Sequence, residues 1–230
     1  MRKSDPFLIA GLLFVSLPLS GCVSLASINI RDGSAFFPTL RASHDLQSPE
    51  ESRKSLAIDM EVSGASGKSS QYLSSGEYIE HGNDIINGPA QVEASCNLSN
   101  AMLGIRSGWI FQKVDIEWMA GLDLLGSEIK LKSGAQSPTV KLFNAGPFFG
   151  WKFSLKPTET VRLYVKSKVS TDFSGAYGLT SGELAASKHL AQNVALFAGW
   201  RWVNLNYNQD YASDIHIDIS GPTVGMEWAF

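Results

Sequence analysis

Apolar and polar residues alternate along much of the chain after residue 55, with the two-residue period of β-strands. The first such stretch, 56–63, predicts a strand with two distinct faces. These faces carry Ile58, Met60 and Val62 against Asp59, Glu61 and Ser63. Seven further strands are predicted at 92–109, 114–120, 149–155, 161–168, 180–190, 194–203 and 215–230. The pattern therefore predicts an all-β domain of about eight strands.

Two of these stretches change the parity of their apolar positions part of the way along. In 92–109 the apolar residues are even-numbered up to Leu98 and odd-numbered from Ala101. One extra residue in a strand reverses the face that each later side chain takes. We therefore expect a β-bulge near Asn100. A second change of parity lies at Gly221-Pro222, within the last strand.

Long and short connections alternate between the predicted strands. Residues that favour loops are frequent at 64–91, 126–138, 175–178 and 207–214, and the first of these loops has room for a short hairpin. Short turns follow the second, fourth and sixth strands. Outer-membrane β-barrels alternate short periplasmic turns with long external loops in this way. We expect a closed antiparallel up-and-down barrel over 55–230, with its apolar face toward lipid.

A soluble β-sandwich or a lipocalin-like barrel would show the same alternation, because it buries the face that a membrane barrel turns to lipid. The alternating loop lengths favour the membrane barrel, and so do tryptophans near the predicted strand ends. A third feature is the end of the chain. Val224, Met226, Trp228 and Phe230 stand at every second position there, and they resemble the assembly signal of outer-membrane barrels. That resemblance implies recognition by the barrel assembly machinery.

Residues 1–21 are typical of a bacterial export signal, with an apolar run at 7–17 that is too short to span a bilayer as a helix. The run ends in Leu19-Ser20-Gly21-Cys22, which resembles the lipobox of bacterial lipoproteins. An ordinary signal cut a few residues later is the alternative. The resemblance implies a lipid anchor at Cys22 and, because Val23 follows instead of Asp, delivery to the outer membrane. Residues 22–54 lack sustained periodicity and are expected to form a periplasmic tether.

From residue 56 to the end, the chain resembles the eight-stranded OmpA/OmpX-type outer-membrane β-barrels of Gram-negative bacteria. The resemblance rests on the architecture and on the terminal signal. It implies a fold and a location in the bacterial outer membrane but no single activity. Barrels of this shape include structural anchors, adhesin-like proteins, narrow pores and a few lipid-modifying enzymes.

Composition narrows the range of partners. Charged residues make up 18% of the chain and its formal net charge is −3, with no Lys/Arg cluster among the aromatic residues. Nucleic acid is therefore not an expected partner. Cys22 and Cys96 lie in unrelated contexts, which excludes a disulfide framework, and Cys and His do not recur at the spacing of zinc ligands. We expect no cofactor and no bound metal.

The polar face of the predicted strands carries many charges. The predicted lumen residues are Asp59, Glu61, Asp115, Glu117, Lys152, Arg162, Lys166, Lys168, Arg201 and Glu227. An eight-stranded barrel is just wide enough to be filled by side chains, so opposite charges are expected to pair across it. We expect Glu227 to pair with Arg201 or with another inward cation. A gated narrow pore, in which these pairs exchange partners, is the alternative.

Two other groups have residue types that a reactive or metal site needs. Asp214, His216 and Asp218 project from one side of a strand, but neighbours there are about 7 Å apart, which disfavours one shared ion. Ser187 and His189 resemble the pair of lipid A deacylase barrels in reversed order, without an orienting acid, which disfavours an esterase.

The sequence thus predicts a non-enzymatic outer-membrane barrel that serves envelope structure or surface interaction. Its expected partners are outer-membrane lipids and an extracellular ligand at the loops. A narrow ion-conducting pore and a lipid-modifying enzyme are the alternatives.

Overall fold

The computed structural model describes residues 24–47, 54–81, 84–172, 176–208 and 213–230, and almost all of them form β-strands. The strands are β1 (Ser24–Leu25), β2 (Ile28–Ser34), β3 (Phe37–Gln47), β4 (Lys54–Leu73), β5 (Glu77–His81), β6 (Asp84–Asn87), β7 (Ala90–Ile110), β8 (Val114–Lys132), β9 (Thr139–Leu155), β10 (Val161–Thr171), β11 (Tyr177–Ala191), β12 (Val194–Tyr207) and β13 (Ile215–Ala229). Nowhere in these ranges is there a helix long and apolar enough to cross a membrane.

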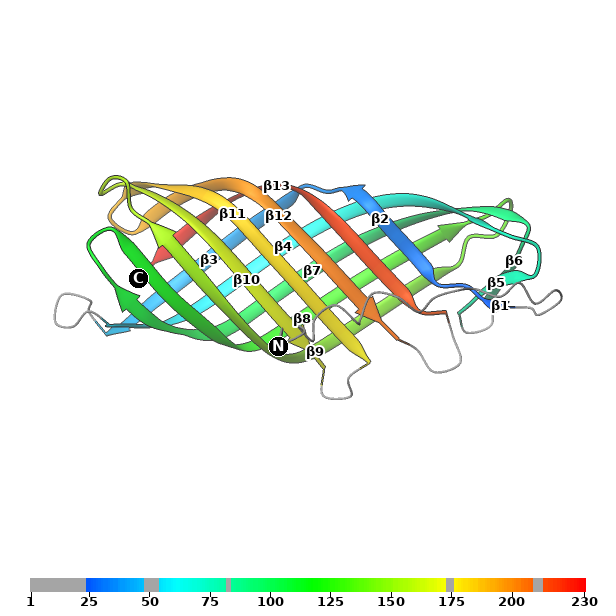
Figure 1. Ribbon diagram of the computed structural model, residues 1–230, viewed down its shortest axis with the longest axis horizontal. Coiled ribbons are helices and arrows are strands. Elements are labelled where there is room, and N and C mark those ends of the chain that lie inside the picture. The colour runs from blue at the N-terminus through cyan, green and yellow to red at the C-terminus, as the bar shows by residue number, and fades with distance from the viewer. Residues whose placement is uncertain (1–23, 48–53, 82–83, 173–175, 209–212) are drawn as a thin grey trace, which may run out of the picture.

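Nine strands form a closed ring of hydrogen-bonded neighbours (Figure 1). Their order is β3, β4, β7, β8, β9, β10, β11, β12 and β13, and β13 then pairs with β3. The prediction of about eight strands was therefore wrong. The missing strand comes from the region 22–54, which was expected to be a tether but supplies β1, β2 and β3.

The odd number of strands determines how the ring closes. Neighbouring strands run antiparallel from β3 round to β13, so the first and the ninth strand run in the same direction. The closing pair is accordingly parallel, with Thr223 opposite Phe37 and Ala229 opposite Ser43. The first part of β13 pairs in parallel with β2, beginning with Ile215 opposite Ile28. Two short strands, β2 and β3, thus share the edge of one long strand.

Hydrogen bonds of side chains connect β2 to β4, whereas backbone hydrogen bonds join the neighbouring strands of the ring. The Ser69 hydroxyl donates to the Asn29 carbonyl at 3.0 Å, and the Gln71 side-chain carbonyl accepts from the Asn29 amide at 2.9 Å. The Gln71 amide group also donates to the Ser27 carbonyl at 3.1 Å. These contacts give the edge groups of β2 partners without a regular strand pairing.

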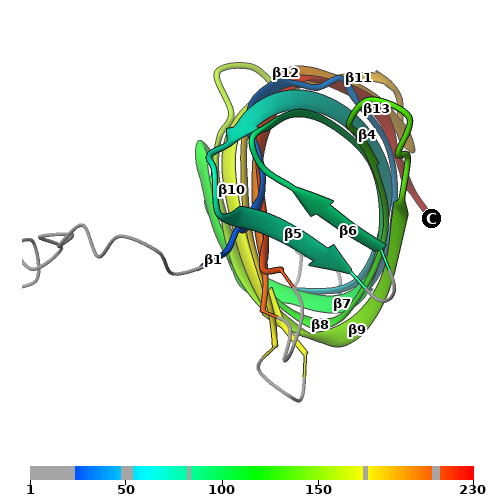
Figure 2. The ribbon, with the colours of Figure 1, turned by 90° about the vertical axis from the view of Figure 1, so that its right-hand side faces the viewer.

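A small three-stranded sheet lies across one end of the ring (Figure 2). It consists of the hairpin β5–β6, which we call the cap, and of β1, which pairs in parallel with β5. The loop predicted at 64–91 thus contains the expected hairpin, but its first ten residues continue β4. We call this the cap end of the ring. The opposite end, with the short turns after β7, β9 and β11 and the terminal Phe230, is the turn end.

The two halves of the ring have opposite polarity. In the turn-end half, the outer face is apolar and the inner face is charged. Exposed outer residues there are Leu40, Met60, Leu103, Trp118, Leu124, Phe149, Trp151, Leu184, Trp200, Val224, Met226 and Trp228. We call this belt of outward side chains the apolar band.

In the cap-end half the polarity is reversed, with a polar outer face and an apolar core inside. The buried core residues include Ile28, Ile30, Leu73, Val92, Cys96, Leu98, Ile129, Leu131, Leu179, Leu205, Ile217 and Ile219, together with Ile79 and Ile86 of the cap. The exposed outer residues include Ser66, Lys68, Ser70, Glu93, Asn97, Lys130, Lys132, Asn206 and Asp218. The cap completes this core by covering its open end.

This reversal explains the parity change that predicted a bulge near Asn100. Strand β7 pairs with β4 continuously from Ala90 to Trp109, and with β8 from Glu93 to Ile110. The prediction of a bulge was therefore wrong. Apolar side chains point inward up to Leu98 and outward from Leu103 because the surroundings of the strand change, while its backbone stays regular. The same reversal accounts for the change at Gly221-Pro222, since β13 pairs without interruption with β12.

The reversal predicts which of two adjacent residues on β11 carries stability. Leu179 is buried in the core and Thr180 is exposed on the outer face. Leu179→Ala should cost about 2–5 kcal/mol of unfolding free energy, because it leaves a cavity. Thr180→Ala should stay within about 0.5 kcal/mol. Urea unfolding followed by tryptophan fluorescence measures both, and equal costs would contradict the assignment of the faces.

Candidate functional site

The ten predicted lumen residues all lie on the inner face of the ring, nine of them in its turn-end half and Lys168 at the border with the cap-end half. Seven of them are buried, while Asp59, Arg162 and Glu227 are half-buried. The strands hold them there by simple alternation, because the residues on either side of each one point outward and, apart from Ser167 between Lys166 and Lys168, are apolar. The structure also brings residues into this group that sequence reasoning did not include.

Two carboxylates share the cations at the centre of the group. Glu61 lies 2.8 Å from the Arg41 guanidinium, 2.6 Å from the Lys166 ammonium and 2.7 Å from the Arg201 guanidinium. Glu183 lies 2.8 Å from Arg41 and 2.6 Å from Arg201. This cluster joins β3, β4, β10, β11 and β12 across the interior. Opposite strands of the ring are therefore connected by charge.

Tyr164 completes the surroundings of these charges. Its hydroxyl donates to Glu183 at 2.6 Å and accepts from Arg41 at 2.5 Å. The guanidinium of Arg41 also lies over the Phe197 ring, with 4.1 Å from its carbon to the ring centroid. A buried cation is stabilised both by carboxylates and by the face of an aromatic ring. Arg41 has both kinds of partner.

A second cluster is organised by Arg106, closer to the turn end. Its guanidinium pairs with Asp59 at 2.7 Å and with Glu117, and it donates to the Ser43 hydroxyl at 2.9 Å. Ser43 in turn donates to Asp59 at 2.8 Å. Asp115, the remaining acidic residue of this region, pairs with Lys156 at 2.6 Å. Asp59 and Glu117 thus pair with a cation from a neighbouring strand, and Asp115 pairs with one from the turn that follows β9.

Glu227 does not lie beside Arg201, the first of the two kinds of partner that were expected for it. In the ladder of β12 with β13, Arg201 lies opposite Gly221, six residues away from Glu227. Glu227 instead lies opposite Arg41 on β3, where the ring closes. Glu227, Arg41 and Lys152 line the same small cavity in the interior. The other part of the expectation, another inward cation, agrees with this arrangement.

A thin apolar layer and a third charged cluster separate these pairs from the core of the cap-end half. The layer consists of Met102, Met119 and Phe148. Gly104 and Gly121 make room for it, since a Cβ atom at Gly104 would lie 2.6 Å from the Phe148 ring. On the other side of this apolar layer, the Lys168 ammonium lies 2.9 Å from the Asp123 carboxylate. Asp123 also accepts hydrogen bonds from Asn100 at 2.6 Å and Ser170 at 2.7 Å.

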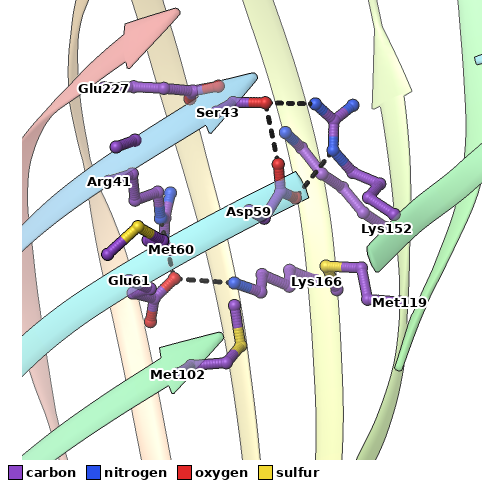
Figure 3. A pocket seen from close by; sticks show the side chains of 12 residues that line it. Arg41, Ser43, Asp59, Met60, Glu61, Met102, Met119, Lys152, Lys166 and Glu227 are labelled. Atoms are coloured by element: carbon purple, nitrogen blue, oxygen red, sulfur yellow. Dashed lines mark hydrogen bonds and ion pairs between the residues drawn. The ribbon is translucent and has the colours of Figure 1, made fainter. Parts of the chain in front are cut away.

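Side chains fill the interior and leave little free space. One cavity has a volume of about 30 Å³. Its lining includes Arg41, Asp59 and Glu61, which are drawn in Figure 3. A second cavity of about 30 Å³ lies at the border of the apolar core, beside Phe37 and Leu98. Spaces of this size hold one or two water molecules. The arrangement is suited to joining the walls of the ring and leaves no room for a substrate among these residues.

Sequence reasoning missed five inner residues for identifiable reasons. Arg41 fell in the expected tether, and Glu183 lay on the strand with the least regular alternation. Arg106 followed the expected bulge, so its face was not assigned. Asp123 lay beyond residue 120, where its strand was predicted to end. Tyr164 did stand on the inward parity of its strand, and a count of inward polar residues that included tyrosine would have found it.

The other residues singled out in the sequence lie apart from this group. Val224, Met226, Trp228 and Phe230 are exposed on the outer face of the last strand and its end. Asp214, His216 and Asp218 stand on the outer face near the cap end, and no metal-binding group of three His, Cys, Asp or Glu residues occurs in the described ranges. Ser187 and His189 lie on the inner face near the turn end. Cys22 lies outside the described residues.

The shared carboxylate Glu61 should be the most sensitive position of the network. Glu61→Gln leaves Arg41, Lys166 and Arg201 with one charge fewer to oppose them, which should cost about 3–5 kcal/mol of unfolding free energy. Glu159→Gln is a matched control, because Glu159 is exposed in the turn between β9 and β10. Urea unfolding of the refolded protein measures both. A loss at Glu61 no larger than at Glu159 would contradict a stabilising network.

Comparison with known proteins adds no relative: the chain matches no protein-family model and no curated protein sequence. What the structure establishes is a β-strand protein built on a ring of nine mostly antiparallel strands.

Proposed function

We propose that this protein is a closed β-barrel of the bacterial outer membrane that conducts no ions and has no enzymatic activity. In this proposal the turn-end half is embedded in the lipid, and the cap-end half stands in water as a rigid platform for surface interaction. Outer-membrane lipids and the barrel assembly machinery are its partners.

The observation that carries the proposal is the apolar band around the turn-end half. Trp118, Trp151 and Trp200 are each more than two-fifths exposed there, although the interior behind them is charged. A protein that kept this surface in water would expose a continuous apolar belt, which monomeric soluble proteins rarely do. Lipid removes that cost, because apolar side chains are favourable there and charges are not.

The height of the band fits the same interpretation. On β12 the outward apolar residues run from Val194 to Trp202, after which Asn204 and Asn206 follow. That length agrees with the roughly 9–11 residues that a tilted strand needs to cross the hydrocarbon core. Strand β7, with 21 residues, is about twice as long. The additional length corresponds to the cap-end half, whose outer face is polar.

The terminal strand supports an orientation with the turn end in the periplasm. Phe230 and the outward residues before it resemble the assembly signal, and the short turns lie at the same end. Ser24 pairs with the cap strand β5, so it lies at the opposite end.

The packing of the interior supports a closed barrel over the pore that the sequence left open. A conducting path needs continuous water, whereas most charges of the turn-end half lie in ion pairs and the cap-end half contains an apolar core. Each of the cavities described above has room for only one or two water molecules. We therefore assign the charges to structure and the outer surface of the cap-end half to interaction.

Two positions on the outer face of β11 test the membrane boundary. Leu184→Arg places a charge in the apolar band and should cost about 2–4 kcal/mol near the bilayer midplane. Thr180→Arg, on the same face beyond the band, should be tolerated because it remains in water. Reversible folding into lipid vesicles measures the difference. Equal effects at both positions would argue against insertion of the turn-end half.

Conductance is the direct test of a closed interior. The full chain, reconstituted into planar bilayers, should give no channel events above those of the protein-free membrane. Insertion is checked separately by heat-modifiable migration on gels. Inserted protein that opens ion channels would overturn the closed barrel and favour the narrow pore.

A further inference from the structure

The outer face of the cap-end half is not uniform, because its lysines gather on one side. Lys68 lies on β4, Lys130 and Lys132 on β8, and Lys141 on β9. On the other side of the ring, the outward residues of β11, β12 and β13 at the same level include Thr180, Asn204, Asn206 and Asp218. One side of the platform is therefore cationic.

The register of the strands brings three of these lysines around one serine. Lys68 is opposite Ser95 on β7, and Ser95 is opposite Lys130 on β8. Lys132 lies two residues further along β8, opposite Glu93. We call Lys68, Ser95, Lys130 and Lys132 the lysine groove. Its members come from three adjacent strands of continuous pairing, so their spacing is fixed by the sheet.

Two hollows overlap at the lysine groove. One has a volume of about 630 Å³ and includes Ser70, Ser137 and Lys132 in its lining, and the other has about 370 Å³ and includes Ser66 and Asn97. Lys68, Ser95 and Lys130 line both. The lining offers ammonium groups for anions, with hydroxyl and amide groups that suit sugar hydroxyls.

The charges of the groove are only partly compensated. Lys130 lies 3.0 Å from Glu128, and Lys141 lies 3.9 Å from the same carboxylate. Lys68 and Lys132 have no carboxylate within ion-pair distance among the described residues, and Glu93 is the one acidic residue that lines the two hollows. An anion with several charges could therefore contact two ammonium groups that the chain itself leaves unpaired.

The height of the groove above the apolar band limits what can reach it. Lys68 follows the outward residue Val62 by six positions on β4, and the outward residues between them are Gly64 and Ser66. At about 3.3 Å per residue and a tilt of about 40°, the groove stands roughly 15 Å above the band. The polar interface of a phospholipid bilayer adds only about 6 Å on each side. A phospholipid head group is too short, whereas a phosphorylated oligosaccharide on a lipid extends far enough.

We propose that the lysine groove binds the phosphorylated sugar head group of an outer-leaflet glycolipid beside the barrel. The inference rests on the proposed function, because it needs the cap-end half on the outer side of the membrane. Phosphate groups contact Lys68 and Lys132, and sugar hydroxyls contact Ser70 and Ser95.

Binding of lipopolysaccharide to the full chain in detergent micelles tests the proposal. Lys68→Ser with Lys132→Ser should weaken binding about tenfold, the effect of losing two exposed charge contacts. Lys113→Ser with Lys188→Ser removes the same charge from exposed positions near the turn end and should change it less than about twofold. An equal loss in both double variants would indicate general charge attraction and overturn the proposal.

Two changes of the probe identify what the groove recognises. Removing the phosphates of the lipopolysaccharide should weaken binding to the wild-type chain about as much as the Lys68 and Lys132 substitutions do. Unchanged binding would overturn phosphate recognition. The soluble oligosaccharide released from the same lipopolysaccharide should compete weakly, and competition at equal strength would assign the groove to a soluble saccharide.

A separate measurement keeps this proposal distinct from the proposed function. A membrane-impermeant maleimide should label Ser75→Cys, beside the cap, in intact cells, and should not label Asn193→Cys at the turn end, with the unmodified chain as background. Absence of labelling at Ser75 would overturn the orientation, and with it the proposed function, even if purified protein bound lipopolysaccharide. Labelling as expected without binding would overturn the groove alone.

Discussion

The pairing of buried charges is the interaction on which the turn-end half of the ring depends. Removing a carboxylate from water costs several kcal/mol unless cations and hydrogen-bond donors replace the water. Glu61 and Glu183 meet that condition only together, because Arg41 and Arg201 each lie between them. Since these four residues come from β3, β4, β11 and β12, the ring has to be closed before any of them is fully paired.

The interiors of the two halves are filled by different kinds of side chain. A ring of this width leaves an interior that side chains must occupy. In the turn-end half, ion pairs fill it and the apolar residues point outward. In the cap-end half, aliphatic residues fill it and polar residues point outward. The layer around Phe148 and the Lys168–Asp123 pair form the transition between the two interiors.

Much of the fold could be predicted from the sequence, since alternation assigned the faces of strands such as β4 and β10 residue by residue. The polarity reversal could not, because an alternating strand has the same pattern whichever face meets water. Sequence reasoning therefore interpreted the parity change at Asn100 as a bulge. Strands β2 and β3 were missed because charged residues and Pro38 interrupt their pattern. Pro38 is the second residue of β3, a position where a strand tolerates proline.

The sequence predicted most of the charged residues of the interior, but it did not predict which of them pair with one another. Which cation meets Glu227 depends on the register across the closing pair, and that register involves β3, a strand that alternation did not predict. Once β3 is in place, Arg41 stands opposite Glu227 by pairing alone. Long-range pairing of this kind is set by the whole ring and not by any local stretch of sequence.

The parallel closure also sets an order of events for folding. The hydrogen bond from the Thr223 hydroxyl to the Phe37 carbonyl joins residues separated by 186 positions in the chain. Contacts between residues so far apart form slowly, because the entropy of closing the intervening loop is lost before the contact is gained. Until the C-terminal strand arrives, the edges of β3 and β12 remain unpaired. A chaperone or an assembly factor that holds these two edges would therefore act at the slowest step of making the ring.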